Sequence, residues 1–265
     1  MSELILKTNS MISKSKIKFI QSLRNKKTRD DELLYVIEGD KLVNEYILSG
    51  RTIRLLAAKP DFLNSLTNAQ KALIPEIESV NNEVLQNIST LVTPHNALAV
   101  VPYTENFFDP KVILNDLSVA LEFVQDPGNL GTIIRSAAWF GIKNIVCSFD
   151  CVDKYNPKVI QATMGAIMHV NVYYCNLLDF LKEANKRKVT VYGALMEGRS
   201  IYSMDLKRDG VILLGNESKG ISENLTPFIS EKIVIPKFSI FKYGIDSLNV
   251  GMAATVFFSE FARRL

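Results

Sequence analysis

The stretch SVALEFVQDPGNLGTIIRSAAWFGIKNIVCS, residues 118–148, decides the fold class, because it passes from an apolar run through a helical segment to a second apolar run. SVALEFV and NIVCS are rich in apolar and β-branched residues, as strands buried on both faces of a parallel sheet must be. GTIIRSAAWFG between them reads as a helix. The stretch therefore predicts a strand–helix–strand unit of a parallel sheet that is covered by helices.

The same alternation continues to the end of the chain. Further strands are expected at VNVYY, VTVYGAL, GVILLG and EKIVIP, and further helices at PKVIQATMGAI, LLDFLKEANKR and LNVGMAATVFFSEFARRL. We therefore expect a doubly wound α/β domain in this part of the chain. Ligands bind such sheets at the carboxyl ends of the strands, so the loops that follow these strands are where function is expected.

Residues 33–101 predict a smaller α/β module of short strands and short helices. LLYVIE, TIRLLAA and NALAVV are expected to be strands, while Asp40 and Asn82 are expected to cap helices. The pattern breaks around YTENFFDP, where prolines flank polar and aromatic residues. We therefore expect two domains, residues 1–104 and residues 105–265.

Composition excludes several classes of protein. The chain has 265 residues, enough for one large or two smaller cores, and 47% apolar with 22% charged residues excludes a disordered, collagenous or low-complexity chain. No apolar run reaches the ~18–20 residues that a membrane span requires. MSELILKTNS, residues 1–10, lacks the features of a signal peptide. We expect no membrane partner and a cytoplasmic protein.

The metal-binding residue types are scarce. Cys147, Cys151 and Cys175 are an odd number without CxxC spacing, and only two histidines accompany them. A zinc site would have few ligands to draw on. The cysteines are therefore expected to be buried free thiols, and no metal is expected.

Charge is unevenly distributed, although the net charge is only +3. Residues 1–29 contain eight basic residues against one acid, whereas residues 30–105 contain five basic residues against eleven acids. A basic segment of this kind favours an anionic partner, but a solvated helix face would carry the same charge.

The first loop expected to carry chemistry is QDPGNLGTIIRSAAWFG, residues 125–141. The chain turns at Pro127, Asn129 is expected to cap the following helix, and Gly131 is expected to permit a close approach at the helix start. Arg135 is expected about one and a half turns into the helix, near an N-terminus whose free N–H groups favour a phosphate or carboxylate. The alternative is an ordinary turn followed by a surface arginine. The loop does not have the GxGxxG pattern of dinucleotide-binding proteins.

The second loop is LLGNESKGIS, residues 213–222, in which a buried strand leads directly into Gly215, Asn216 and Glu217. Gly220 is expected to let the loop fold back on itself. Removing a carboxylate from water at the end of a buried strand costs free energy, unless the carboxylate is paired with another group or takes part in binding or catalysis.

The third loop, IPKFSIFKYGIDSLNVG, residues 235–251, mixes aromatic, basic and glycine positions before the last helix. Ser247 is expected to cap that helix and Asn249 to lie in its first turn, while Gly251 is one of several small residues that allow close packing. Ordinary loop chemistry is the alternative for the second and third loops. The three loops together bring an arginine, a glutamate and two amides to the expected ligand site without identifying the ligand.

DPGNLGTIIR, GNESKG after a buried strand, and IP followed by SLNVGMAA resemble the three ordered motifs of the SpoU (TrmH) RNA 2′-O-ribose methyltransferases of the SPOUT class. ISKSKIKFIQSLRNKKTRDDELLYVIEGDKLVNE, residues 12–45, resembles the RNA-binding domain that precedes the catalytic domain in many members. The resemblance covers nearly the whole chain. The chief departure lies at Gly251 and Met252, where many relatives have a serine or another small residue and a valine.

The resemblance implies a C-terminal parallel-sheet domain tied in a trefoil knot, preceded by a small α/β RNA-binding domain similar to ribosomal proteins L30e and L7Ae. It implies a homodimer in which Arg135 reaches RNA bound to the partner. It also implies S-adenosyl-L-methionine as the cofactor, held largely by backbone groups. The residues implied at the cofactor pocket are Ala194, Leu195, Gly215, Asn216, Ile235 and Leu248.

The reaction implied by the resemblance is in-line attack of a ribose 2′-oxygen on the methyl carbon of the sulfonium. Arg135 either accepts the hydroxyl proton in an unusual site or fixes the adjacent phosphate and stabilises the developing alkoxide. Asn129, Glu217, Ser247 and Asn249 are implied to hold Arg135 and the RNA. The residues expected to contact RNA from the basic segment are Lys14, Lys16, Lys18, Lys26, Lys27 and Arg29.

Ribosomal RNA is expected as the substrate rather than transfer RNA, because a separate RNA-binding module is more usual in members that modify ribosomal RNA. Transfer-RNA 2′-O-methylation is one alternative. A non-catalytic RNA-binding factor for ribosome assembly is another, although Arg135, Glu217 and Asn249 argue against it. An oxidoreductase of the nucleotide-binding α/β type is disfavoured by the missing glycine pattern.

Overall fold

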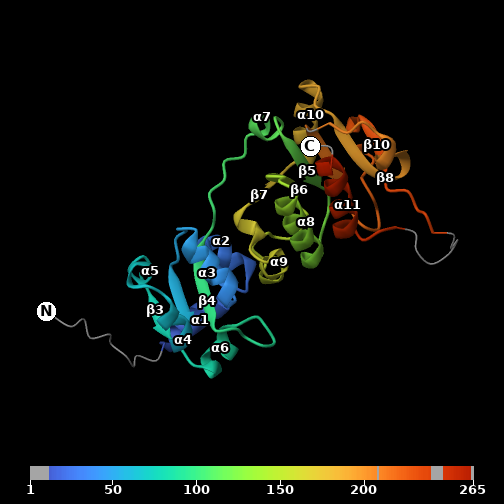
Figure 1. Cartoon of the computed structure of the whole chain (residues 1–265). Helices are drawn as coiled ribbons and strands as arrows, with labels where there is room; N and C mark the ends of the chain where they lie inside the picture. Colours follow the sequence, from blue (N-terminus) through green and yellow to red (C-terminus); the bar gives the residue numbers. More distant parts are fainter. Residues whose placement is uncertain (1–11, 208, 240–246, 264–265) are drawn as a thin grey trace. The chain divides into compact units, whose positions relative to one another are not determined.

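The computed structural model describes residues 12–207, 209–239 and 247–263, and these residues divide into two compact units, each with its own sheet (Figure 1). The first unit contains the described residues up to Glu105 together with residues 155–157, and the second contains the remainder. Within the described part of the chain, no helix is long and apolar enough to cross a membrane.

The first unit has a four-stranded sheet in the order β1-β4-β2-β3, in which β4 is antiparallel to both of its neighbours and β2 is parallel to β3. The strands expected at LLYVIE, TIRLLAA and NALAVV are confirmed. The strand β3 has only three residues and was not expected from the sequence. The elements are α1 (Lys14–Ser22), α2 (Lys26–Glu32), β1 (Leu34–Glu38), α3 (Asp40–Leu48), β2 (Leu55–Ala58), α4 (Pro60–Ser65), α5 (Asn68–Ala72), β3 (Ile77–Ser79), α6 (Asn82–Ile88) and β4 (Ala97–Pro102).

Two helix starts in this unit differ from expectation. The N-cap of α3 is Gly39, and Asp40 instead accepts a hydrogen bond from the backbone N–H of Asn96 at 2.8 Å. The N-cap of α6 is Asn81 rather than Asn82, because the Asn81 side chain accepts from the third residue of the helix, as a cap requires. Both helices were expected in the right place, but each observed cap lies one residue before the expected one.

The second unit has a six-stranded sheet in the order β10-β8-β9-β5-β6-β7, and every neighbouring pair is parallel. All strands and helices expected here are confirmed. The elements are α7 (Pro110–Ile113), β5 (Leu117–Leu121), α8 (Pro127–Trp139), β6 (Asn144–Ser148), α9 (Pro157–Thr163), η1 (Ala166–Met168), β7 (Asn171–Cys175), α10 (Leu177–Lys186), β8 (Val191–Ser200), η2 (Ile201–Ser203), β9 (Gly210–Leu214), η3 (Thr226–Phe228), β10 (Glu231–Val234) and α11 (Val250–Arg263).

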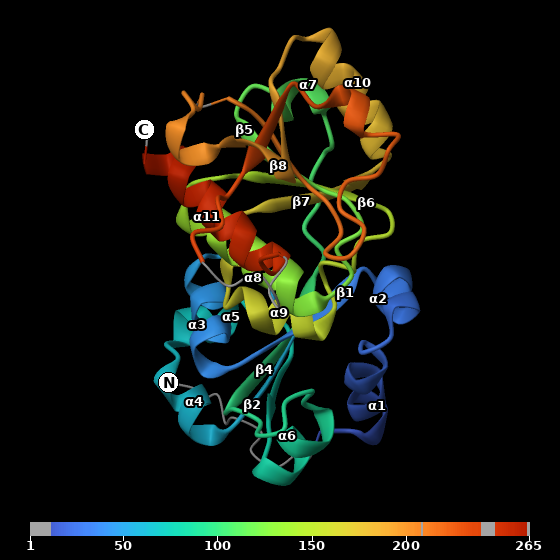
Figure 2. The same cartoon turned by 90° about the vertical axis from the view of Figure 1, so that its right-hand side faces the viewer.

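The central strands of this sheet are buried on both faces. In β5, Val119 and Leu121 pack with α8 and α11, whereas Ala120 between them packs with α10 on the other face. Figure 2 shows α8 and α11 together on one side of the sheet and α10 on the other. From β5 the chain continues to β6 and β7 on one side, whereas β9, inserted between β5 and β8, leads to β10 on the other side, so the carboxyl ends of β5 and β9 meet where the order of the strands reverses. Such a reversal is where open α/β sheets bind ligands.

The helices α8 and α11 pack closely because small residues lie between them. A Cβ added at Gly251 would lie 3.2 Å from Thr132 on α8, and the Ser136 and Thr255 hydroxyls hydrogen-bond at 2.6 Å. Gly131 also permits the close approach expected of it, since a Cβ there would lie 2.3 Å from Ala162 of α9. The amino ends of α8 and α11 are thereby fixed side by side at the carboxyl edge of the sheet.

Candidate functional site

The first site loop joins β5 to α8, and Asp126 is its organising residue. The Asp126 side chain accepts a hydrogen bond from the Asn129 backbone N–H at 2.9 Å and caps α8, which begins at Pro127. Asn129 is therefore not the cap, contrary to the sequence-based expectation. Its own side chain is left to bind elsewhere.

Arg135 lies further along α8 than expected. It is the ninth residue of the helix, about 12 Å along the axis from the first, rather than one and a half turns in. The side chain is exposed, and it forms no hydrogen bond or ion pair with any residue that the structure describes. The Arg135 guanidinium is therefore not adjacent to the free N–H groups at the start of its own helix.

The second site loop folds back as expected and is held by Asn216. The backbone N–H groups of Asn216 and Gly220 each donate to the other residue's carbonyl, at 3.0 and 2.8 Å, and Gly220 has a φ of +68°. The Asn216 side chain accepts from the N–H groups of Ser218 and Lys219 at 2.9 and 3.0 Å. A Cβ on Gly215 would lie 2.2 Å from the Gly220 carbonyl carbon, so this turn requires glycine at position 215.

Three predicted site residues meet in one hydrogen-bond network that joins the three loops. The Asn129 side-chain amide donates to Glu217, and the Asn249 amide donates to the Asn129 oxygen at 2.9 Å and to Glu217 Oε1 at 3.3 Å. Glu217 is thus paired as a carboxylate at a strand end should be. The network holds residues from all three motifs, but not Arg135, at one point.

Asn249 also starts the last helix, a role that the sequence analysis gave to Ser247. The Asn249 Oδ1 atom accepts from the backbone N–H groups of Gly251 and Met252 at 3.0 and 3.3 Å, which is how an N-cap acts. Ser247 is exposed two residues earlier. A residue that both caps α11 and binds Asn129 fixes the helix start to the network.

Glu122 and Phe123 make further hydrogen bonds at the carboxyl edge of the sheet, although the sequence analysis did not single them out. Glu122 Oε2 accepts from the backbone N–H of Ser222 at 2.8 Å, and the Asn216 amide donates to the Phe123 carbonyl at 3.0 Å. Phe123 has a φ of +59°, which is uncommon for a residue with a side chain. The directly paired strands β5 and β9 explain these contacts, but strand order is not visible in the sequence.

The residues expected at the cofactor pocket lie after β9 and β10 and in the middle of β8. Pairing of β8 with β9 ends at Gly193, and pairing with β10 jumps from Gly193 to Arg199, so residues 194–198 have no strand partner in the described sheet. Ala194 and Leu195 are half-buried in this segment. Backbone groups without a strand partner suit a cofactor that is held mainly through the backbone.

The other expected pocket residues lie in the loops that bound this segment. Ile235 follows β10 directly and is half-buried against the core, and Leu248 is half-exposed just before α11. Residues 240–246 of the third loop lie outside the described residues. The five residues Ala194, Leu195, Gly215, Asn216 and Ile235 lie within or directly after three neighbouring strands, and one pocket built from them stays a prediction.

The basic segment forms α1, the following turn and α2, and its charges divide into two groups. Lys14, Lys18 and Lys27 are exposed. Lys16 pairs with Glu78 at 2.6 Å and with Glu76 at 3.2 Å, and the hydrogen bond to Glu78 raises the pKa of Lys16. Lys26 is exposed but pairs with Asp30.

The predicted RNA contact at Arg29 is wrong. Arg29 is only 2% exposed, and its Nη1 donates to the carbonyls of Leu23 and Arg24 at 2.9 and 2.8 Å. Its guanidinium therefore ties the turn after α1 to α2 instead of facing solvent. A count of charges cannot distinguish such a structural arginine from a surface one.

The cysteines confirm the expectation of free thiols, with Cys147 and Cys151 buried and Cys175 half-buried. Cys151 accepts a hydrogen bond from the Val124 N–H at 3.3 Å beneath the first site loop. The hydrogen bond from the Cys147 thiol lowers the pKa of Cys151 to about 7. Among the described residues, no group of three or more His, Cys, Asp or Glu side chains could hold a metal ion.

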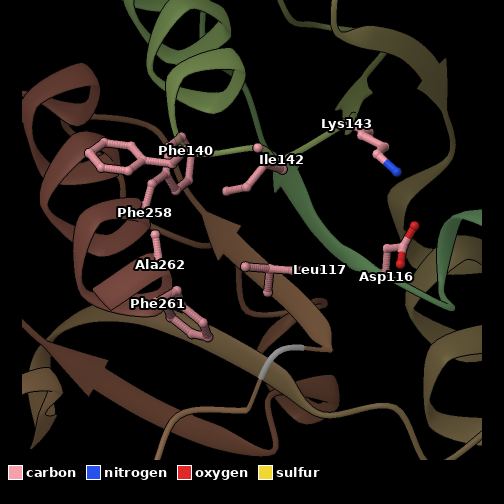
Figure 3. Close-up of a pocket in the computed structure, with 9 residues that line it drawn as sticks. Asp116, Leu117, Phe140, Ile142, Lys143, Phe258, Phe261 and Ala262 are labelled. Atoms are coloured by element: carbon pink, nitrogen blue, oxygen red, sulfur yellow. The ribbon is translucent and has the colours of Figure 1, made fainter. Parts of the chain in front are cut away.

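A separate pocket of about 140 Å³ lies at the opposite edge of the sheet, where β5 and β6 begin (Figure 3). Phe140, Phe258 and Phe261 form its apolar side, and Asp116 and Lys143 lie on the other. Ligand pockets are usually ~300 Å³ or larger. Its small size and its place at the amino ends of the strands argue against it as the site of a cofactor as large as S-adenosylmethionine.

Comparison with known proteins gives matches over both units. The SpoU rRNA methylase family model matches residues 116–259, and a model described as the MRM3-like substrate binding domain matches residues 14–99. The 23S rRNA (guanosine(2553)-2′-O)-methyltransferase RlmP of Bacillus subtilis is 27% identical over 244 residues, which cover 91% of this chain and 93% of that protein.

Two solved structures resemble the chain along almost its full length. A protein from Porphyromonas gingivalis assigned to the TrmH family of RNA methyltransferases has a TM-score of 0.84 and 32% identity, and the match covers 97% of this chain and 100% of that one. The rRNA methyltransferase from Sinorhizobium meliloti with bound AdoMet has a TM-score of 0.83 and 27% identity, with 97% of each chain covered.

Proposed function

Since the chain belongs to the SpoU rRNA methylase family, we propose that it transfers a methyl group from S-adenosylmethionine to a ribose 2′-hydroxyl of ribosomal RNA. The relative from Bacillus subtilis, which is described as a 23S rRNA 2′-O-methyltransferase, supports both the reaction and the type of RNA. The AdoMet-bound relative from Sinorhizobium meliloti supports the cofactor.

The observation that carries this proposal is the network of Asn129, Glu217 and Asn249 at the reversal of the strand order. These residues come from three distant segments, and each belongs to a different one of the family's motifs. In a fold that had lost its catalytic activity, two amides and a carboxylate would not need to stay paired at one edge of the sheet. Their pairing favours an enzyme over a non-catalytic RNA-binding factor.

The division of labour follows from the chemistry. The cofactor supplies a methyl group that is already activated, so the chain has to place the ribose and ease the loss of its proton. The network fixes the ends of α8 and α11 relative to the loop after β9, and residues 194–198 with Gly215 and Ile235 provide backbone for the cofactor. Arg135 acts on the ribose hydroxyl or its neighbouring phosphate, with a planar guanidinium suited to both.

The knot, the type of the first domain and the cellular location are proposed on the same resemblance. We propose that the C-terminal segment is threaded through a loop to form a trefoil knot, and that residues 1–104 form an RNA-binding domain of the L30e/L7Ae type while residues 105–265 form the methyltransferase domain. The cytoplasm is the proposed location. The matches at residues 14–99 and 116–259 support the division into these domains.

We also propose that the protein acts as a homodimer. Arg135 is exposed in the third turn of α8, and it does not reach the Asn129–Glu217–Asn249 network of its own chain. A second copy placing its Arg135 near this network would complete the site. Ser247, next to the network, is proposed to face the RNA.

The substrate proposal is tested by mapping 2′-O-methyl groups in RNA from cells with and without the gene, and again after complementation. A 2′-O-methyl group removes the hydroxyl required for alkaline cleavage, so a methylated site leaves a gap in a hydrolysis ladder. We expect one gap in ribosomal RNA to disappear, in a loop or junction where a ribose can enter a cleft. A gap lost only from transfer RNA would overturn the substrate, and loss of a base methylation alone would overturn the reaction.

A further inference from the structure

Two aromatic side chains stand exposed at the carboxyl edge of the second sheet, outside the network. Phe238, four residues beyond the end of β10, is 81% exposed, and Tyr202 in η2 is 44% exposed. Their ring centroids are 6.3 Å apart with an interplanar angle of 31°. This separation is within the 4.5–7 Å typical of interacting rings, so Tyr202 supports Phe238 from one side while most of the Phe238 surface stays open.

The position of this pair follows from the strands that carry it. Tyr202 lies two residues beyond β8 and Phe238 lies four residues beyond β10, and these strands pair through Ser200 and Val234 at their carboxyl ends. The strand β10 is the edge of the sheet, and two strand spacings, about 10 Å, separate it from β9, which leads into Glu217. A base-stacked strand rises ~3.4 Å per nucleotide, so the pair lies within a few nucleotides of a ribose held at the network.

The same two strands carry one exposed arginine, and exposed rings of this kind suit an RNA strand. Arg199 pairs with the edge of β10 and leaves most of its side chain exposed, 3.7 Å from Glu231. Exposed Phe and Tyr rings are a means by which proteins hold unstacked RNA bases, because every base offers a π face to stack on. An isolated exposed Phe would be unremarkable, but a supported ring pair next to the proposed active site is a platform.

We infer that Phe238, supported by Tyr202, stacks on a base of the RNA substrate close to the methylated nucleotide. This inference rests on the proposed function. The two are positioning residues, because they hold the RNA and do not touch the reacting atoms. The stacked base is a neighbour of the target nucleotide, since the target ribose is expected at the Asn129–Glu217–Asn249 network, two strand spacings away from β10.

The test compares Phe238→Ala, Phe238→Leu and Phe238→Tyr in the full-length protein, with a fragment of the mapped ribosomal RNA as the probe. Removing a stacking ring is expected to raise the KM for RNA about tenfold, within the range measured for one stacked base. The kcat at saturating RNA and the Kd for S-adenosylmethionine should not change. Phe238→Tyr keeps the ring and should behave as wild type, whereas Phe238→Leu keeps only apolar volume and should resemble the alanine variant.

Phe107→Ala is the matched control, because Phe107 belongs to the same unit, is 88% exposed and lies before the first strand of the sheet. It should leave every parameter unchanged. A series of RNA fragments that each lack one base near the target then locates the contact, since removing the stacked base should abolish the difference between wild type and Phe238→Ala.

Any of three results in Phe238→Ala would overturn the inference, and the first is an unchanged KM for RNA. A weaker affinity for S-adenosylmethionine would assign the pair to the cofactor pocket. An altered oligomeric state would assign the pair to a contact between copies of the chain. Failure of the proposed function is distinguishable. In that case the wild-type protein itself would not methylate the fragment.

Discussion

Replacing Gly215 by alanine tests whether the loop after β9 is the cofactor site. The added Cβ would lie 2.2–2.4 Å from the carbonyl carbon and oxygen of Gly220 and from the backbone nitrogen of Ile221. These are backbone atoms and cannot rotate away. The paired hydrogen bonds between Asn216 and Gly220 must therefore open, and Glu217 moves with them.

The cost can be worked from these contacts. Two backbone hydrogen bonds contribute about 0.5–1.5 kcal/mol each, and forcing a methyl group into a packed turn costs a further ~1–3 kcal/mol. If the loop relieves part of the clash by opening, the loss of unfolding free energy is about 2–4 kcal/mol. For a domain of this size the melting temperature should fall by about 4–16 °C. Opening of the loop should also weaken the affinity for S-adenosylmethionine at least tenfold, which is equivalent to ~1.4 kcal/mol of binding free energy.

Titration calorimetry and thermal unfolding measure the two effects, and Gly141→Ala is the control. Gly141 has a φ of +76° with no atom within 4 Å of an added Cβ, and it follows α8, remote from the site loops. That variant should lose ~1–2 kcal/mol of stability through backbone strain alone and bind the cofactor normally. Wild-type cofactor affinity in Gly215→Ala would refute the assignment of this loop to the pocket.

Three further substitutions separate the roles assigned above. Arg135→Ala and Arg135→Lys should both abolish methyl transfer at unchanged cofactor affinity, because lysine lacks the planar fork, and turnover by the lysine variant would remove Arg135 from the mechanism. Neutralising the exposed Lys14, Lys18 and Lys27 together should weaken RNA binding and reduce the slope of log K against log salt by about 2–3, and an unchanged slope would make this a solvated helix face. Asn249→Asp should keep the α11 cap but lose most methyl transfer, because a second carboxylate would face Glu217 in place of a donating amide, whereas Asn249→Ala should also lose the cap, at a cost of ~0.5–2 kcal/mol of stability. Equal activity in Asn249→Asp and wild type would contradict the role given to the network.

The strands of the second unit could be predicted because each is a short, continuous apolar run between polar turns, which is typical of parallel strands buried on both faces. The meeting of Asn129, Glu217 and Asn249 could be predicted for a related reason, since loops at the carboxyl ends of parallel strands share one edge of a sheet. The helix caps could not be predicted to the residue. Asp126 and Asn129 are both good caps, and only the three-dimensional structure shows which one accepts the hydrogen bond.

The two arginines singled out by the sequence show where such reasoning ends. Arg29 and Arg135 each lie in a segment that favours an anionic ligand, yet one guanidinium is buried against backbone carbonyls and the other is exposed. Burial depends on packing that residue types do not reveal. The paired Glu217 and the exposed Arg135 lead to one conclusion. The network satisfies its own polar groups, so the Arg135 guanidinium is left to act at the site of a second copy. A site whose acid and amides are already satisfied within one chain can receive an arginine from a second chain without disturbing its own loops, and this is the physical basis for the proposed dimer.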